Sequence, residues 1–248
     1  MVIVSKNNPL VKELSSLKEK KFREKSGSFL VEGEKMVREC VHSGLNIRRI
    51  IVRENYAGDT YFLPTVTFGE DAFRAICDEK TPQSIAAEVE IPVYKLQLPE
   101  KSCIVLDGVA DPANVGAIIR TAVAAGYTEL YCINCADPYS PKSVRASMSG
   151  VFFARIMRGG REEILSVLNE TPLIAADMDG ENVFAFTPPE RFALCIGNEG
   201  NGLSNEIFSR AAHTVKIPMG THTESLNAAV SAGILMYQLK KTEMLKRS

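Results

Sequence analysis

Hydrophobic positions recur along the chain with two different periods, which predict an alternation of helices and strands. Leu10, Leu14 and Leu17 fall at helical spacing within 8–25, with Asn8 as a candidate cap and Pro9 at the first helical position. The same reading predicts helices over 34–44 and 67–81 and strands over 28–33, 46–55 and 83–92. These elements predict a small α/β unit over residues 1–92.

A second unit follows a short stretch of weak periodicity. Residues 91–102 hold two prolines, so we place a linker at 93–102 and a second domain at 103–248. The predicted strands of that domain are 103–109, 129–135, 172–178, 191–200 and 213–219, and its predicted helices are 114–126, 161–170 and 225–246, with a loop and helix over 140–153. Strands that alternate with helices predict an α/β fold with a mostly parallel sheet and helices on both faces.

Composition narrows the class of protein. Of 248 residues, 45% are hydrophobic and 24% are charged, as in ordinary globular proteins. No apolar run approaches the ~18 residues that a membrane span needs, and the first residues show no apolar segment typical of a signal peptide. We therefore expect a cytoplasmic protein that does not cross a membrane.

The six cysteines raise the question of a metal or redox site. Cys132 and Cys135 have C-x-x-C spacing, but no second pair of ligands lies near them in the sequence. Most of the six stand in apolar runs. We therefore expect buried thiols and no metal site.

Charge is distributed unevenly, although the net charge is only −1. Residues 1–53 carry twelve Lys and Arg against six Asp and Glu, whereas 54–98 carry three against eight. Between 138 and 161 there are five basic residues and no acidic one. Two basic patches on a neutral protein suit contact with a phosphate backbone, although a solvated surface explains such runs equally simply.

Polar residues follow strands at three places in the second unit, where a parallel sheet exposes ligand sites. In the first, LDGVADPANVGAIIRTAVAAG (106–126), Asn114 and Arg120 stand near the start of a helix on adjacent turns. An Asn amide and an Arg guanidinium in this position suit a phosphate or a polar substrate. A capping Asn and a surface Arg are the simple structural alternative.

The second place is a glycine-rich loop, IGNEGNGLS (196–204). Gly197, Gly200 and Gly202 predict tight turns and close approach of a ligand to the backbone, and Glu199 is an acid held among them. The order of the glycines is that of neither a dinucleotide-binding motif nor a P-loop. The alternative is a plain connection between strand and helix, with Ser204 as the N-cap.

The third place is IPMGTHTESLNAAVSAG (217–233), where a strand gives way to the last helix. Ser225 as the N-cap would account fully for that residue. Asn227 within the first turn is less well explained, because Asn forms helix poorly there.

The three segments, in this order and spacing, resemble the SpoU (TrmH-like) RNA 2′-O-ribose methyltransferases of the SPOUT superfamily. The likeness continues through SPKSVRASMSGVFF (140–153), and residues 8–40 are similar to the small substrate-binding domain that many of these enzymes carry. The resemblance implies a C-terminal half tied in a trefoil knot, which no periodicity could predict. One departure is that relatives read SLNVSVA where this chain has SLNAAVS, so we expect altered packing at Ala228, Ala229 and Ser231.

The resemblance also implies a cofactor and a set of active-site residues. S-adenosylmethionine (AdoMet) would bind at Gly197, Ile217 and Leu226, with Met219 and Asn227 beside them. The catalytic positions would be Arg120, Asn114, Glu199, Ser225 and Asn227. Because a guanidinium hardly deprotonates, we expect Arg120 to bind a neighbouring phosphate or to stabilise the developing alkoxide rather than to act as a base. The methyl group of AdoMet is already activated, so no metal is required.

Partners follow from the same resemblance. Family enzymes are homodimers whose sites take residues from both subunits, so Arg120 would act across the interface. We assign RNA contacts to basic residues and one serine, namely Lys142, Arg145, Ser147, Arg155, Lys20, Lys21 and Arg23. Arg145 and Ser147 match a family loop motif.

The predicted function is AdoMet-dependent 2′-O-ribose methylation of large-subunit (23S) rRNA. The extra N-terminal domain favours rRNA by analogy over the tRNA substrates of relatives with shorter extensions. The alternatives are a tRNA 2′-O-methyltransferase and a non-catalytic RNA-binding or ribosome-assembly factor. The complete polar set argues against the latter. A nucleotide-dependent oxidoreductase is disfavoured because no dinucleotide-binding motif occurs.

Overall fold

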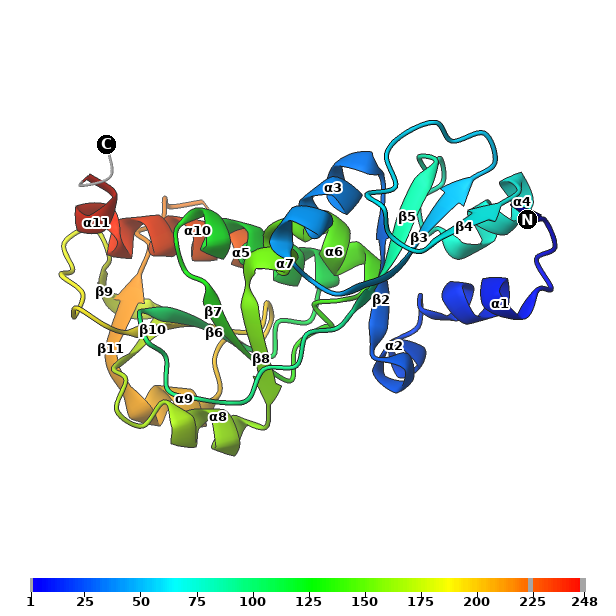
Figure 1. Ribbon diagram of the computed structural model, residues 1–248. Helices are drawn as coiled ribbons and strands as arrows, with labels where there is room; N and C mark the ends of the chain where they lie inside the picture. The colour runs from blue at the N-terminus through cyan, green and yellow to red at the C-terminus, as the bar shows by residue number, and fades with distance from the viewer. Residues whose placement is uncertain (1, 223–224, 246–248) are drawn as a thin grey trace.

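The computed structural model describes residues 2–222 and 225–245, which form two α/β units side by side (Figure 1). The first unit is built on a mixed five-stranded sheet and the second on a parallel six-stranded sheet. The described N-terminal end lies in the first unit and the C-terminal end in the second, at opposite ends of the molecule.

The sheet of the first unit has the order β1-β4-β3-β5-β2, with β5 antiparallel to both of its neighbours. Its strands are β1 (Val2–Ile3), β2 (Ser28–Glu32), β3 (Ile47–Arg53), β4 (Thr65–Phe68) and β5 (Ile85–Glu90). Its helices are α1 (Pro9–Ser16), α2 (Lys20–Ser26), α3 (Glu34–Ser43) and α4 (Glu70–Ile76). The prediction of one helix from 67 to 81 was wrong at its start, because residues 65–68 pair with β3 as a strand.

The predicted helix over 8–25 is two helices with a break between them. The start is as predicted, since the Asn8 side chain accepts a hydrogen bond from the Leu10 N–H and Pro9 takes the first helical position. At the break, the Arg23 guanidinium donates to the carbonyl oxygens of Leu17 (2.7 Å) and Lys18 (2.8 Å). A side chain of α2 therefore satisfies carbonyls that the end of α1 leaves free.

The sheet of the second unit has the order β11-β9-β10-β6-β7-β8, and every neighbouring pair is parallel. Its strands are β6 (Cys103–Asp107), β7 (Glu129–Ile133), β8 (Arg155–Gly159), β9 (Leu173–Asn182), β10 (Ala193–Ile196) and β11 (Ala211–Lys216). Its helices are α5 (Pro112–Ala124), α6 (Pro141–Ser147), α7 (Gly150–Phe153), α8 (Arg161–Val167), α9 (Asn205–Arg210), α10 (Ala228–Leu239) and α11 (Lys241–Leu245). The predicted parallel α/β architecture is confirmed.

Helices cover both faces of this sheet, with α5 and α10 on one face and α8 and α9 on the other (Figure 1). Alternate residues of each strand point to opposite faces. Ile104 and Leu106 of β6 therefore join a cluster with α5 and α10, whereas Val105 joins a second cluster with α8 and α9. Strands β6, β7 and β10 are buried along their whole length, which explains their nearly continuous apolar sequences, whereas β8, β9 and β11 are partly exposed.

One hydrophobic cluster spans both units, and each unit also has a cluster of its own. The larger cluster extends from β2 and α3 of the first unit to α6 and α7 of the second. Phe29 packs on Tyr139 with ring centroids 5.1 Å apart. Beside them the Arg23 guanidinium donates to Asp137 Oδ2 at 2.7 Å, and both side chains are at least 95% buried. A buried ion pair and an apolar contact thus fix the first unit against the second.

All six cysteines are free thiols, and five of them are buried, as predicted. Among residues 2–222 and 225–245, no group of three or more His, Cys, Asp or Glu side chains is arranged to hold a metal ion. Over the same residues, no helix combines the length and the apolar character needed to cross a membrane.

Candidate active site

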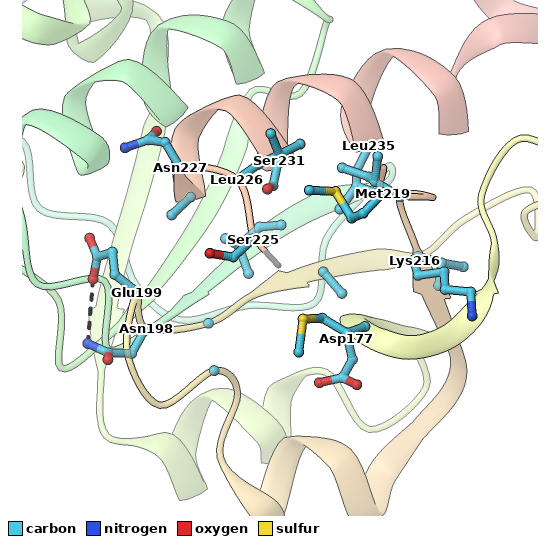
Figure 2. Close-up of a pocket in the computed structure, with 18 of the residues that line it drawn as sticks. Asp177, Asn198, Glu199, Lys216, Met219, Ser225, Leu226, Asn227, Ser231 and Leu235 are labelled. Atoms are coloured by element: carbon cyan, nitrogen blue, oxygen red, sulfur yellow. Dashed lines mark hydrogen bonds between the residues drawn. The ribbon is translucent and has the colours of Figure 1, made fainter. Parts of the chain in front are cut away.

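A cavity of about 890 Å³ opens where β10 and β11 end and α10 begins, beside the middle of β9 (Figure 2). Its walls are both apolar and polar, as is usual for small-molecule sites. The lining residues are Ala176, Asp177, Met178, Ile196, Gly197, Asn198, Glu199, Gly202, Val215, Lys216, Ile217, Pro218, Met219, Ser225, Leu226, Asn227, Ala228, Ser231 and Leu235. The cavity stands at the carboxyl ends of parallel strands, where ligands bind in this class of fold.

The loop after β10 is folded back on itself along one wall. The Asn198 N–H donates to the Gly202 carbonyl (2.9 Å), and the Gly202 N–H donates to the Asn198 carbonyl (3.0 Å). A Cβ at Gly197 would overlap the backbone of Gly202 and Leu203. Gly197 is therefore required by the loop's own backbone, whereas the sequence had suggested approach to a ligand.

A chain of side-chain hydrogen bonds joins three distant segments beside the cavity. Asn227 Nδ2 donates to Asn114 Oδ1 (2.9 Å), and Asn114 Nδ2 donates to Glu199 Oε1 (2.8 Å). Asn227 Oδ1 also accepts from the N–H groups of Ala229 and Val230 and is the N-cap of α10. The suggestion that Ser225 caps this helix was wrong. Capping by Asn227 explains why an Asn stands at the start of the helix.

Glu199 is held by more donors than Asn114 alone. The N–H groups of Ala110 and Asp111 donate to its two carboxylate oxygens at 3.1 and 3.3 Å. Burial by itself would raise the pKa of Glu199, but the hydrogen bonds from Asn114 and from these N–H groups outweigh it and bring the pKa below its usual value. The carboxylate is therefore ionised and fixed in orientation at neutral pH.

Most of the predicted site residues meet at this cavity. Gly197, Ile217, Met219, Leu226 and Asn227, which were predicted to contact a cofactor, line it together with Glu199 and Ser225. Asn114 reaches it through its hydrogen bond to Asn227.

Arg120 is not among the lining residues. It lies on α5 and is exposed to solvent, and its guanidinium forms no hydrogen bond or ion pair with any other residue that the structure describes. Within a single chain, Arg120 is therefore separate from the polar residues with which it was grouped.

Comparison with known families bears directly on the second unit. Residues 101–237, more than half of the chain, match the model of the SpoU rRNA Methylase family. The chain belongs to this family. Residues 8–87 match a second model, that of the MRM3-like substrate binding domain.

Known SpoU relatives resemble the chain over nearly its whole length. It is 32% identical to the Bacillus subtilis 23S rRNA (guanosine(2553)-2′-O)-methyltransferase RlmP, over 96% of this chain and 98% of the relative. It is 30% identical to the Streptomyces viridochromogenes 23S rRNA (uridine(2479)-2′-O)-methyltransferase, over 91% and 87%. The crystal structure of an AdoMet-bound rRNA methyltransferase from Sinorhizobium meliloti superimposes with a TM-score of 0.88 at 26% identity, covering 98% of each chain.

Two of the residues predicted to bind RNA are engaged in ion pairs. Lys142 Nζ lies 2.8 Å from Asp111 Oδ1. Arg145 contacts Asp78 (2.6 Å) and Glu79 (3.0 Å), which belong to the first unit. Arg145 therefore bridges the two units of this SpoU-family chain, and its side chain remains partly exposed.

The remaining exposed candidates lie on both units. Arg155 is the first residue of β8 and pairs with Glu129 at 3.5 Å. On α2, Lys20 and Lys21 are well exposed and form only longer contacts, of 3.7 and 3.1 Å, with neighbouring acids on their own segment. All three side chains are accessible to solvent.

Two predicted RNA contacts are corrected by burial. Arg23 is 2% exposed, and its guanidinium donates hydrogen bonds to Asp137 and to two backbone carbonyls. Ser147 is fully buried, and its hydroxyl donates within the turn that ends α6. Neither side chain is available to a phosphate, so Arg23 and Ser147 serve the packing of the fold.

Several lining residues were missed as functional candidates. Asp177 and Met178 come from β9, and Lys216 comes from the end of β11. Nothing in the local sequence distinguishes them from surface residues, because their position depends on how two strands pair. Ser231, recognised in the sequence only as a departure from relatives, lies on the cavity wall of α10.

Proposed function

We propose that this chain is an AdoMet-dependent RNA 2′-O-ribose methyltransferase that acts on 23S rRNA. One observation carries the proposal. In this SpoU-family protein, a cavity large enough for the cofactor lies directly beside the Asn227–Asn114–Glu199 hydrogen-bond chain. The relatives named for 23S rRNA 2′-O-methylation match over almost the whole chain, and this supports the same substrate class here.

The residues of the cavity fit AdoMet. Its volume falls within the range of about 300–1,000 Å³ that is typical of small-molecule sites. Ile196, Ile217, Leu226 and Leu235 provide apolar walls suited to an adenine ring. We assign cofactor contact to Gly197, Ile217, Met219, Leu226 and Asn227. The AdoMet bound to the Sinorhizobium meliloti enzyme supports the same cofactor in this family.

The polar chain supports a role in placing the ribose. AdoMet supplies a methyl group activated by a sulfonium, and the ribose 2′-oxygen takes it while the hydroxyl proton departs. Asn114, Glu199 and Asn227 are already held in one arrangement by their mutual hydrogen bonds, so little reorganisation accompanies substrate binding. Ser225 adds a hydroxyl at the cavity wall. We assign these four residues to orientation of the substrate.

Arg120 acts from a second subunit in this proposal. It is exposed and outside the cavity of its own chain, and α10 beside α5 carries the exposed apolar side chains Val230 and Tyr237. Pairing two copies through this face would cover the apolar groups and bring Arg120 to the other copy's site. There its guanidinium would bind the phosphate next to the target ribose or stabilise the oxygen as it loses its proton.

We also propose that the C-terminal segment passes through a loop of the second unit to form the trefoil knot. The segments around 196–203, 215–219 and 225–235 share one cavity although other elements separate them in sequence, which supports such threading. A cytoplasmic location follows from the proposed substrate, ribosomal RNA.

RNA contact is assigned to Lys142, Arg145, Arg155, Lys20 and Lys21. The ion pairs of Lys142, Arg145, Lys20 and Lys21 are solvent-exposed, and such pairs contribute only about 0–1 kcal/mol, so phosphates can replace their acidic partners. Arg155 is itself partly exposed, although its partner Glu129 is buried. The match of residues 8–87 to a substrate binding domain supports the contribution of the first unit.

The test is transfer of labelled methyl from AdoMet to unmodified large-subunit rRNA and to bulk tRNA, side by side. We expect label in rRNA alone, at one nucleotide that resists alkaline cleavage. Label in tRNA would keep the reaction and overturn the substrate. Cofactor binding without label in either RNA would favour a ribosome-assembly role, and absence of cofactor binding would refute the enzyme.

A further inference from the structure

Strand β9 leaves the sheet at the cavity and then returns to it. Ala175 pairs with Thr214 of β11, but the next paired residue, Glu181, faces Val215, which directly follows Thr214. Residues 176–180 therefore project from the sheet as one excursion. Gly180 closes it, because a Cβ there would lie 2.6 Å from the backbone N and C atoms of Val215. Bulges of this kind redirect side chains and are common near active sites.

The excursion brings a carboxylate to the cavity. Asp177 lines the cavity and is half-buried, and its Oδ1 accepts a hydrogen bond from the Asp179 N–H at 3.0 Å. Within residues 2–222 and 225–245, Asp177 forms no ion pair. The other lining carboxylate, Glu199, is fully engaged by protein donors. Asp177 is therefore the acid of this wall that is open to a cationic ligand.

A cation stands nearby on the neighbouring strand. Lys216 ends β11, is half-buried, and lines the same cavity. Its ammonium group forms neither a hydrogen bond nor an ion pair with the described part of the chain, so it is not neutralised by Asp177. Figure 2 shows Asp177 and Lys216 together at one side of the cavity, and Glu199, Asn198 and Asn227 at the other. A half-buried carboxylate and a half-buried ammonium group that do not pair with each other favour a ligand that carries both a positive and a negative group.

We propose that Asp177 and Lys216 form the subsite for the amino-acid end of AdoMet. The Asp177 carboxylate accepts hydrogen bonds from the ammonium group, and the Lys216 ammonium donates to the carboxylate. This places the amino-acid end at the wall opposite the polar chain that orients the ribose. The inference rests on the proposed function, since it assumes that the cavity binds AdoMet.

The test compares three ligands by isothermal titration calorimetry, which reads binding without catalysis. The ligands are AdoMet, decarboxylated AdoMet, which keeps the ammonium group, and 5′-methylthioadenosine, which lacks the whole amino-acid end. The variants are Asp177→Asn, which retains the oxygen that accepts from the Asp179 N–H, and Lys216→Met, which keeps an unbranched side chain. Asp179→Asn is the matched control, because its exposed side chain lies on the same excursion outside the lining. Thermal melts followed by circular dichroism verify that each variant is folded.

We expect Asp177→Asn to weaken AdoMet and decarboxylated AdoMet by about 10- to 100-fold and to leave 5′-methylthioadenosine within about threefold. Lys216→Met should weaken AdoMet by about 10-fold and leave the other two ligands unchanged. Equal losses for all three ligands, or no loss for AdoMet in either variant, would overturn the subsite while the proposed function stands. Failure of the unmodified protein to bind AdoMet would overturn both.

Discussion

Gly197 provides a direct test of how the loop after β10 supports the cavity, because Gly200 lies in the same loop and serves as its control. In Gly197→Ala the new Cβ would lie 2.5 Å from the Gly202 carbonyl oxygen and closer still to the adjoining backbone, whereas ordinary contacts begin at 3.4 Å. The loop backbone must therefore move by about 1 Å to restore normal contact distances.

That movement has a definite cost. Overpacking costs about 1–3 kcal/mol, and each backbone hydrogen bond between Asn198 and Gly202 contributes about 0.5–1.5 kcal/mol, so the substitution should destabilise the protein by roughly 2–6 kcal/mol. For a protein of this size the melting temperature should fall by at least about 4 °C. Because Gly197, Asn198 and Glu199 line the cavity, the affinity for AdoMet should fall roughly tenfold or more.

Gly200→Ala should behave differently. The nearest atom to its new Cβ is Asn198 Oδ1 at 3.6 Å, an ordinary contact, and the backbone of Gly200 is not left-handed. The loss of freedom in the unfolded chain should make this variant neutral or slightly stabilising, by up to about 1 kcal/mol. Differential scanning calorimetry and titration with AdoMet measure both effects. Equal behaviour of the two variants would refute the assignment of Gly197 to close packing within the loop.

Other side chains separate catalysis, cofactor binding and stability. Arg120→Ala should abolish methyl transfer but leave AdoMet affinity within about threefold, because Arg120 lies outside the cavity; lost affinity in a titration would contradict this division. Leu226→Arg puts a cation in the cavity wall and should lower that affinity roughly tenfold or more, so retained affinity would speak against the assigned site. Arg23→Met removes the closer cationic partner of buried Asp137, leaving Arg158 at 3.7 Å, and should lower the free energy of unfolding in urea by about 3–5 kcal/mol; a loss below about 1 kcal/mol would show the pair to be dispensable. Burial alone would raise the pKa of the Asp107 carboxyl, but the hydrogen bonds from Ser204 and Arg161 outweigh it and bring the pKa below the ordinary 3.8. Its stabilisation is therefore present above pH 3.8 and lost as the pH falls through the lower folded-state pKa, so Asp107→Asn should destabilise the protein at pH 7 and flatten the acid dependence of unfolding below pH 4; an unchanged acid profile would exclude this role.

The sequence was most informative where local chemistry decides the structure. Asn8 and Pro9 start α1 as their types predict, and the apolar runs of the second unit became strands buried on both faces. The sequence was less informative where a contact joins residues that are distant in the chain. At the break between α1 and α2, Arg23 is held by Asp137, which lies 114 residues away. The hydrophobic periodicity of residues 8–25 cannot predict that contact.

The candidate site shows the same division. Segments that follow strands were expected to meet at one edge of the sheet, and Gly197, Ile217, Leu226 and Asn227 do line one cavity. The resemblance to a known family supplied the residue roles. Arg23 and Ser147 were assigned to RNA by residue type and neighbourhood, and burial alone shows that they are inaccessible.

By itself, the sequence determined most of the helices and strands, the parallel α/β class of the second unit and the three segments that carry the polar site residues. Tertiary structure decided which side chains meet. The hydrogen bond from Asn227 to Asn114 joins residues 113 positions apart, and Asp177 reaches the cavity only because β9 skips five residues against β11. Strand order and register fix such contacts, and both depend on the packing of the whole sheet rather than on any local pattern.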